Sequence, residues 1–157
     1  MNISIPTRIK IVQAFAPKTT NAALTSQVIT VKNSIRAWLV LHFTNAVGFA
    51  SVPTIKQATT IAAGTNAAGP TCRIWANEDT SVNDTLVAQT AGASYTTDAV
   101  AKNKTVVFEI DVASLTDGYP CIYCTIATSS QATNFVSGEW LLWANFQQAT
   151  IPTAILD

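Results

Sequence analysis

The residues of this chain that could do chemistry are few, and the first is its single histidine. His42 lies in the middle of the most apolar stretch, residues 35–43. A small hydrolase would need this base within reach of a nucleophile, and serines are plentiful. A hydrogen-bonded histidine on a β-strand is the plainer interpretation, so we expect no catalytic role for His42.

Two of the three cysteines form a C-x-x-C pair, Cys121 and Cys124. In redox enzymes this motif opens a helix, whereas here it lies in YPCIYCTI, whose pattern predicts a strand. Residues three apart on a strand point to opposite faces, so the two thiols should diverge. A zinc site would need Cys72 and His42 from distant strands. We predict plain buried thiols, with no metal and no cofactor.

The acidic residues match no familiar site. Glu78, Asp79 and Asp84 lack the spacing of a calcium-binding loop. Glu109 and Asp111 share one side of a strand, as a glycosidase pair would, but a solvated sheet face is the simpler interpretation. The chain also lacks the glycine-rich sequences that bind phosphate. We therefore predict that the protein is not an enzyme.

The strands that would position these residues are clearest near the C-terminus. Residues 105–128 and 139–146 contain three runs rich in β-branched and aromatic residues, separated by turn-forming sequence. In the first run, alternate residues from Val106 onward are apolar. We predict three successive antiparallel strands of one sheet. A single helical turn is expected at residues 111–115.

Six further strands are predicted upstream, at residues 8–15, 26–31, 35–44, 54–61, 71–76 and 85–89. Pro17 should end the first of them, and residues 32–34 should form a tight hairpin turn. In the third, the odd-numbered residues from Ile35 to Phe43 should face the core.

Turn signals every 8–12 residues or so favour a sandwich or barrel. We predict an all-β fold of about 8–10 strands: an antiparallel β-sandwich of the jelly-roll kind, or with immunoglobulin-like strand order. At most one short helical turn is expected. The whole chain, residues 1–157, should be one domain, with residues 1–7 as an extended arm and residues 147–157 as a tail.

The composition limits the partners. Only 11% of residues are charged and the formal net charge is zero, against ~25% charged residues in ordinary soluble domains. Phosphate binding needs a basic patch, so no nucleic acid is expected. No apolar run is long enough to cross a membrane. Three cysteines without an export signal suggest synthesis in a cytoplasm. A surface with little charge repels neighbours weakly and suits a protein that packs against other protein.

Five apolar residues are candidate contacts with a partner. Trp140 and Trp143 have opposite parity on one strand, so only one can face the core. Phe49 lies in a loop, where it could contact a partner or plug the end of the sandwich. Ile3 and Ile5 belong to the N-terminal arm, which could add to a neighbour's sheet or be frayed.

Three sequence stretches carry a resemblance to a known group of proteins. They are WANEDTSVNDTL at residues 75–86, IDVASLTDGYPCI at residues 110–122 and QATIP at residues 148–152. Over roughly residues 26–152 the chain resembles small virion accessory proteins that tailed bacteriophages encode near the major capsid gene. The resemblance implies a jelly-roll-like sandwich that decorates and cements the capsid.

On that resemblance we expect a homo-oligomer, a dimer or trimer, bound to the major capsid protein on the virion surface after synthesis in the host bacterial cytoplasm. The alternative is a tail or baseplate module that binds host glycans on a tryptophan platform. The small hydrolase based on His42 is the third alternative.

Overall fold

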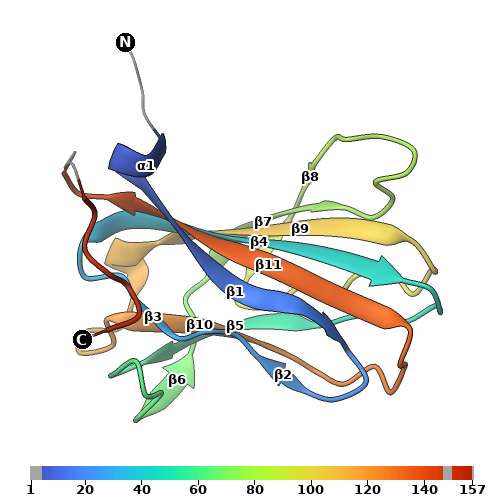
Figure 1. The fold of residues 1–157 in the computed structure, drawn as a ribbon, viewed down its shortest axis with the longest axis horizontal. Coiled ribbons are helices and arrows are strands. Elements are labelled where there is room, and N and C mark those ends of the chain that lie inside the picture. Colours follow the sequence, from blue (N-terminus) through green and yellow to red (C-terminus); the bar gives the residue numbers. More distant parts are fainter. Residues whose placement is uncertain (1–4, 147–149, 157) are drawn as a thin grey trace.

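Two antiparallel sheets packed face to face make up the protein (Figure 1). The computed structural model describes residues 5–146 and 150–156. The six-stranded sheet contains, in spatial order, β1 (Ile9–Thr19), β11 (Asn134–Ala144), β4 (Ser34–Asn45), β9 (Asn103–Asp111), β7 (Cys72–Asn77) and β8 (Val87–Gly92). The five-stranded sheet contains β2 (Leu24–Thr25), β10 (Cys121–Ile126), β5 (Pro53–Ala58) and β6 (Asn66–Ala68), with β3 (Ile29–Thr30) also paired to β10.

The chain passes repeatedly from one sheet to the other. This path places the order β1-β11-β4-β9 over the order β2-β10-β5-β6, which is the strand arrangement of a jelly roll. The hairpin of β7 and β8 extends the larger sheet beyond β9. The predicted all-β antiparallel sandwich is therefore confirmed. The described residues form eleven strands, slightly more than expected, because β2, β3 and β6 are short pairings of two or three residues.

Two predicted pairings were wrong. The three C-terminal strands do not form one sheet, since β9 and β11 belong to the larger sheet and β10 to the smaller. Residues 32–34 join β3 to β4 in the opposite sheet, so they do not close a hairpin. Alternation shows which side of a strand is apolar, but both sheets present an apolar inner side to the same core.

The core lies between the inner faces of the sheets. From the larger sheet, Leu39, Phe108 and Trp140 are fully buried, and from the smaller sheet Ile55 and Ile122. Each such aliphatic side chain contributes about 1.5–3 kcal/mol by leaving water. Most of the predicted core side of β4 is correct.

Ile35 is the exception on β4, with 48% of its surface exposed. The pairing of β4 with β11 shifts register between Trp143 and Ala144, which are opposite Arg36 and Ser34. Ile35 lies at this irregularity and is displaced from the inward alternation, because an extra residue on one strand is left unpaired.

Edge strand β1 does not end at Pro17 as predicted but continues to Thr19. Its pairing with β11 shifts register on both sides of Phe15. Proline is tolerated at an edge or a bulge because no ladder hydrogen bond is lost there. The shifts leave two consecutive side chains, Ala14 and Phe15, buried. On the other side of β1, the N–H of Gln27 donates to the Ala14 carbonyl at 3.0 Å.

The described residues contain two short helical elements rather than at most one. The 3-10 turn η1 (Val112–Ser114) is at the predicted place, and the Asp111 carboxylate accepts from the Ala113 N–H at 3.1 Å. The second is α1 (Ile5–Arg8), so the described part of the predicted arm is not extended. The tail residues 150–156 form no regular element, and the Ala154 carbonyl accepts from the Thr30 N–H at 2.8 Å.

Candidate functional site

The outer face of the six-stranded sheet carries many apolar side chains, with a few charged residues such as Glu109 and Glu139 among them, and we call it the open face. In register across the strands, Ile11 is opposite Leu141 and Leu141 is opposite Trp38. The next row joins Val40, Val107 and Trp75. Its apolar members are all half-buried or exposed: Ile9, Ile11, Trp38, Val40, Trp75, Val107, Leu141 and Trp143. Side chains of this kind are those that protein interfaces cover.

An aromatic pair lies near one end of the open face. The rings of Trp38 and Trp143 are stacked, with centroids 6.1 Å apart and an angle of 28° between their planes. Beside them, Arg36 forms an ion pair with Glu109, and a guanidinium nitrogen of Arg73 lies 3.9 Å from the same carboxylate oxygen. Stacked indoles beside fixed charges can be covered by a protein side chain or by a sugar ring.

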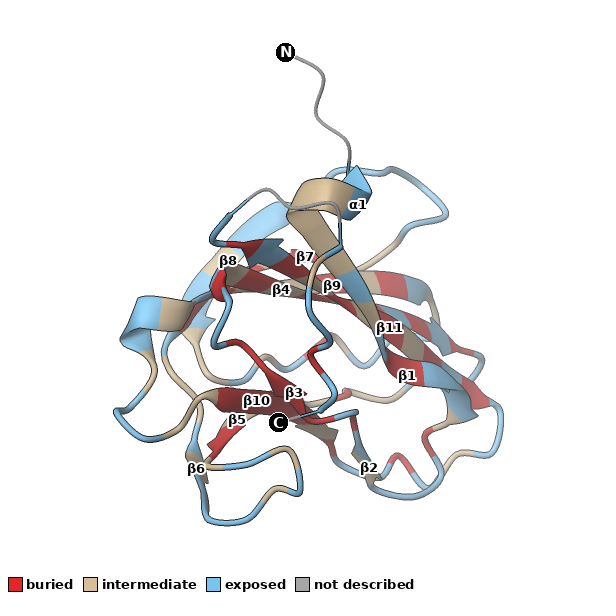
Figure 2. Cartoon of the chain, turned by 60° about the vertical axis from the view of Figure 1, so that its left-hand side comes forward, coloured by how far each residue is buried: buried red, intermediate tan, exposed pale blue. Residues whose placement is uncertain are grey.

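Part of the outer face of the five-stranded sheet is covered by the loop after β5, and most of β10 is coloured as buried in Figure 2. Cys121 and Tyr123 of β10 form a small buried cluster with Ala58 of β5. Ile61 and Ala63, from the loop after β5, pack against this cluster.

The predicted contact residues are dispersed. Trp140 is fully buried in the core, whereas Trp143 is 40% exposed on the open face, so the parity argument is confirmed. Ile5 is exposed in α1, which leads directly into β1 at Ile9, and Ile3 lies outside the described residues. Phe49 is half-buried in its loop, with its carbonyl accepting from Asn45 Nδ2 at 3.1 Å. Their role as contacts stays a prediction.

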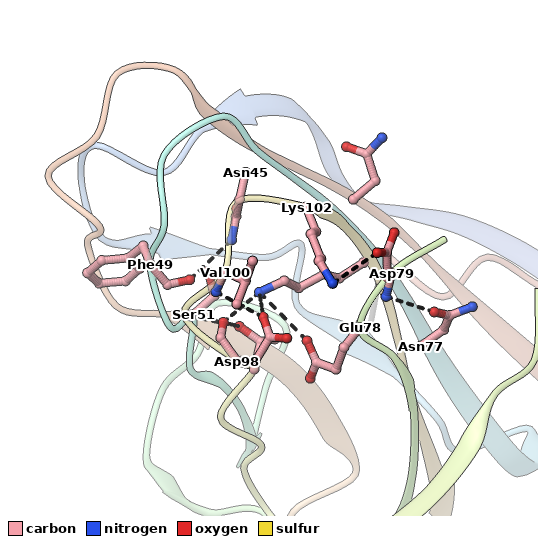
Figure 3. Close-up of polar contacts among 12 residues, drawn as sticks. Asn45, Phe49, Ser51, Asn77, Glu78, Asp79, Asp98, Val100 and Lys102 are labelled. Carbon is pink, nitrogen blue, oxygen red and sulfur yellow. Dashed lines mark hydrogen bonds and ion pairs between the residues drawn. The ribbon is translucent and has the colours of Figure 1, made fainter. Parts of the chain in front are cut away.

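A buried charged cluster lies at the N-terminal end of β9, directly after the loop of residues 98–102. Lys104, on the inner side of β9 opposite Phe43, has a side chain with no exposed surface. Its ammonium forms an ion pair with the Asp98 carboxylate, donates to the Asp98 carbonyl at 2.5 Å and lies 3.7 Å from Glu78 Oε2. Figure 3 shows Glu78 and Asp98 reaching toward a common point from different segments.

Glu78 is held from its other side by Tyr95, whose hydroxyl donates to Oε1 at 2.6 Å. Burial, followed by this hydrogen bond and the negative charges of Glu78 and Asp98, raises the pKa of Tyr95 well above its usual value. The second carboxylate oxygen, Oε2, is buried and has no hydrogen-bond partner. A buried acceptor left without a donor is uncommon and calls for an explanation.

Burial acts on Asp98 to raise its pKa, but this effect is outweighed by the hydrogen bonds from Lys104 and the Val100 N–H and by the charges of Lys104 and Lys102. The net pKa of Asp98 is lowered. Next to the cluster, Asp79 is paired with Lys102 at 2.9 Å between Oδ2 and Nζ. A hydrogen bond from Ser81, and then that from Lys102, lower the pKa of Asp79.

The histidine and the two cysteines of the C-x-x-C pair lie apart from one another. His42 is exposed on the outer side of β4, with its Nδ1 3.2 Å from Thr105 Oγ1, as predicted for a hydrogen-bonded sheet histidine. Cys124 belongs to the main core and Cys121 to the covered outer face, so the two thiols do diverge. Within the described residues, no group of three His, Cys, Asp or Glu side chains could hold a metal ion.

Sequence reasoning missed the cluster of Lys104, Asp98 and Glu78. One signal was present, because Lys104 has the same parity as Val106 and Phe108 and therefore falls on the core side of its strand. Asp98 and Glu78 come from loops whose positions no periodicity reveals.

None of the described helices has the length and apolar character that crossing a bilayer requires. Comparisons of the chain with protein-family models, with curated protein sequences and with solved structures found no match.

Proposed function

We propose that this protein is a structural virion protein that binds the outer surface of a tailed-phage head and stabilises neighbouring capsomers. Its partner is the major capsid protein, and it acts as a small homo-oligomer on the capsid surface. The proposal combines the sequence resemblance of residues 75–86 and 110–122 with the open face.

The open face is the observation that carries the proposal. It presents three tryptophans, Trp38, Trp75 and Trp143, with aliphatic neighbours on a rigid sheet. Interface cores are enriched in aromatic residues and arginine and depleted in other charged residues. Arg36 and Arg73 lie on the same face beside Glu109, and their guanidinium groups could also meet carboxylates of a partner.

A decoration protein does not need a strong single contact. On a symmetric shell, many copies bind at equivalent positions, and an oligomer engages several sites at once, which multiplies modest affinities. A stiff jelly roll with low surface charge suits this task, since little charge has to be desolvated when the surface is covered.

The test is co-sedimentation of the purified protein with phage heads that lack it, followed by cryo-electron microscopy of the decorated particles. We expect saturable binding, and at least a roughly tenfold weaker affinity for Trp143→Ala, because tryptophan is among the residues that contribute most to binding at interfaces. Val82→Ala is the control, because Val82 is 76% exposed but lies in the loop before β8. Absence of binding to heads would refute the proposal.

One observation favours a second function, a tail or baseplate module that binds host glycans. The exposed stack of Trp38 and Trp143 lies beside the charged groups of Arg36 and Glu109, and sugar rings use such aromatic surfaces together with polar partners. Binding of the isolated protein to host-surface glycans on an array, lost in Trp38→Ala, together with no binding to heads, would establish this alternative instead.

A further inference from the structure

We propose that Lys104 and Asp98 become joined by an intramolecular isopeptide bond, with Glu78 acting as general base. The bond would be a modification site within the fold. It is independent of the proposed capsid role and of the open face.

The three side chains are already arranged as the reaction requires. The Lys104 amine contacts the Asp98 side chain directly and is fixed by its further bond to the Asp98 carbonyl at 2.5 Å. Glu78 Oε2, which accepts no hydrogen bond, lies 3.7 Å from the same nitrogen. Tyr95 orients the Glu78 carboxylate through Oε1 and leaves Oε2 available to accept a proton.

The surroundings of the Lys104 amine keep bulk water away from it. The Lys104 side chain is fully buried, with Val106 next on the same side of β9 and Phe43 opposite on β4. The Asp98 side chain is 38% exposed, which gives the departing water a path to solvent.

The reaction is a condensation. One proton passes from the Lys104 ammonium to the Asp98 carboxylate within their ion pair, which makes both groups neutral. The lone pair of Lys104 Nζ then attacks Asp98 Cγ and forms the C–N bond. Glu78 takes the second proton from the nitrogen and delivers it to the hydroxyl group on Cγ. The C–O bond breaks, water leaves, and an amide remains with Glu78 restored.

The proton transfer within the ion pair of Lys104 and Asp98 opposes the reaction, because it replaces two paired charges with neutral groups. Holding the reacting atoms in contact offsets this, because well-oriented intramolecular reactions reach effective concentrations of about 10⁵ M or more. The reaction needs no oxidant and no cofactor, and folding alone brings the reactants together.

The first measurement is the intact mass of the purified, denatured protein. We expect a mass lower than that of the sequence by one water molecule. Trypsin does not cut after an acylated lysine, and residues 105–157 contain no Lys or Arg. Digestion should therefore give one branched product that joins residues 74–102 to residues 103–157, and fragmentation should place the link between residues 98 and 104.

Variants separate this reaction from a plain ion pair. Asp98→Ala and Lys104→Met should show the full sequence mass. Glu78→Gln keeps the size of the side chain and the acceptor for Tyr95, so circular dichroism should show the native fold while the mass remains that of the uncondensed chain. Lys102→Arg, a neighbour paired with Asp79, keeps the trypsin site and should lose water as the original protein does.

Three results would overturn the proposal. One is the full sequence mass for the original protein. Another is a water loss confined to an unlinked peptide, as succinimide formation at Asp117-Gly118 would give. The third is a link from Lys104 to Glu78 instead of Asp98. Complete condensation in Glu78→Gln would remove the assigned role of Glu78.

Discussion

The outer faces of the two sheets differ in what covers them. On the five-stranded sheet, Cys121 and Tyr123 are buried beneath Ile61 and Ala63 of the following loop. On the six-stranded sheet, Trp143 and Ile11 remain 40% and 59% exposed. The chain covers apolar residues of one outer face with its own loop and leaves apolar residues of the other exposed.

This difference shows that the apolar character of the open face is not a general property of the sequence. A low share of charged residues could leave both faces apolar and exposed. Instead, the loop after β5 packs over apolar residues of the five-stranded sheet. The exposed apolar residues of the six-stranded sheet are therefore a specific feature of that face. Substitutions on the covered part of the five-stranded sheet should therefore impair folding. Comparable substitutions on the open face should impair association with a partner.

The largest effect is expected for a charge introduced on the covered face. Ala58→Lys should lower the free energy of unfolding by at least ~3 kcal/mol, because Ala58 is fully buried and the ammonium would lack a partner. The matched change on the open face, Val107→Lys, should cost less than ~1 kcal/mol and instead abolish association with the partner. Urea denaturation measures the first quantity and co-sedimentation the second. Equal destabilisation by the two changes would contradict the comparison.

Truncation of an aromatic side chain should give a smaller contrast. Tyr123→Ala should destabilise the fold by ~3 kcal/mol, since it removes a buried ring and leaves a cavity. Trp143→Ala should cost only ~1 kcal/mol, mainly the stacking contact with Trp38. Both values come from chemical denaturation at constant pH. A larger loss for Trp143→Ala than for Tyr123→Ala would show that the open face is part of the folding core.

The smallest change in stability is expected for a substitution in the loop after β5, which packs against β10. Ile61→Ser should lower stability by only ~1 kcal/mol, because Ile61 is half-buried. It should nevertheless accelerate labelling of Cys121 by a thiol reagent at neutral pH.

The two core thiols serve as the internal control for this experiment. Burial raises the pKa of Cys72 and of Cys124 to about 12, so their reactive thiolate forms are scarce at neutral pH. Peptide mapping should show unchanged labelling of Cys72 and Cys124 in Ile61→Ser. If all three cysteines gained reactivity together, the loop would be stabilising the whole sandwich and not one face.

Local alternation was sufficient to predict the fold class and several individual faces. The parity of Trp140 and Trp143 separated a core residue from an exposed one, and the spacing of Cys121 and Cys124 placed the thiols on opposite sides. The turn capped by Asp111 was also predicted, because its residues interact within four positions of each other.

The assignment of each strand to one of the two sheets could not be predicted in the same way. Strands β9, β10 and β11 follow one another in sequence, but the choice between a hairpin and a crossing depends on long-range packing. The same holds for Glu78 and Lys104, which only the folded chain brings within 3.7 Å of each other. Val40 and Val107 could be recognised as neighbours on one surface only from the strand order, which pairs β4 with β9.

The two shifts of register around Phe15 affect how copies of the protein can meet. A regular edge strand invites another chain to add beside it and can seed fibres. Here β1 is irregular, carries Pro17 and is already bonded to Gln27, so lateral growth of the sheet is blocked along that border. Contacts between copies at this border must therefore be made by side chains, because the backbone of β1 offers no regular row of hydrogen-bonding groups to a neighbour.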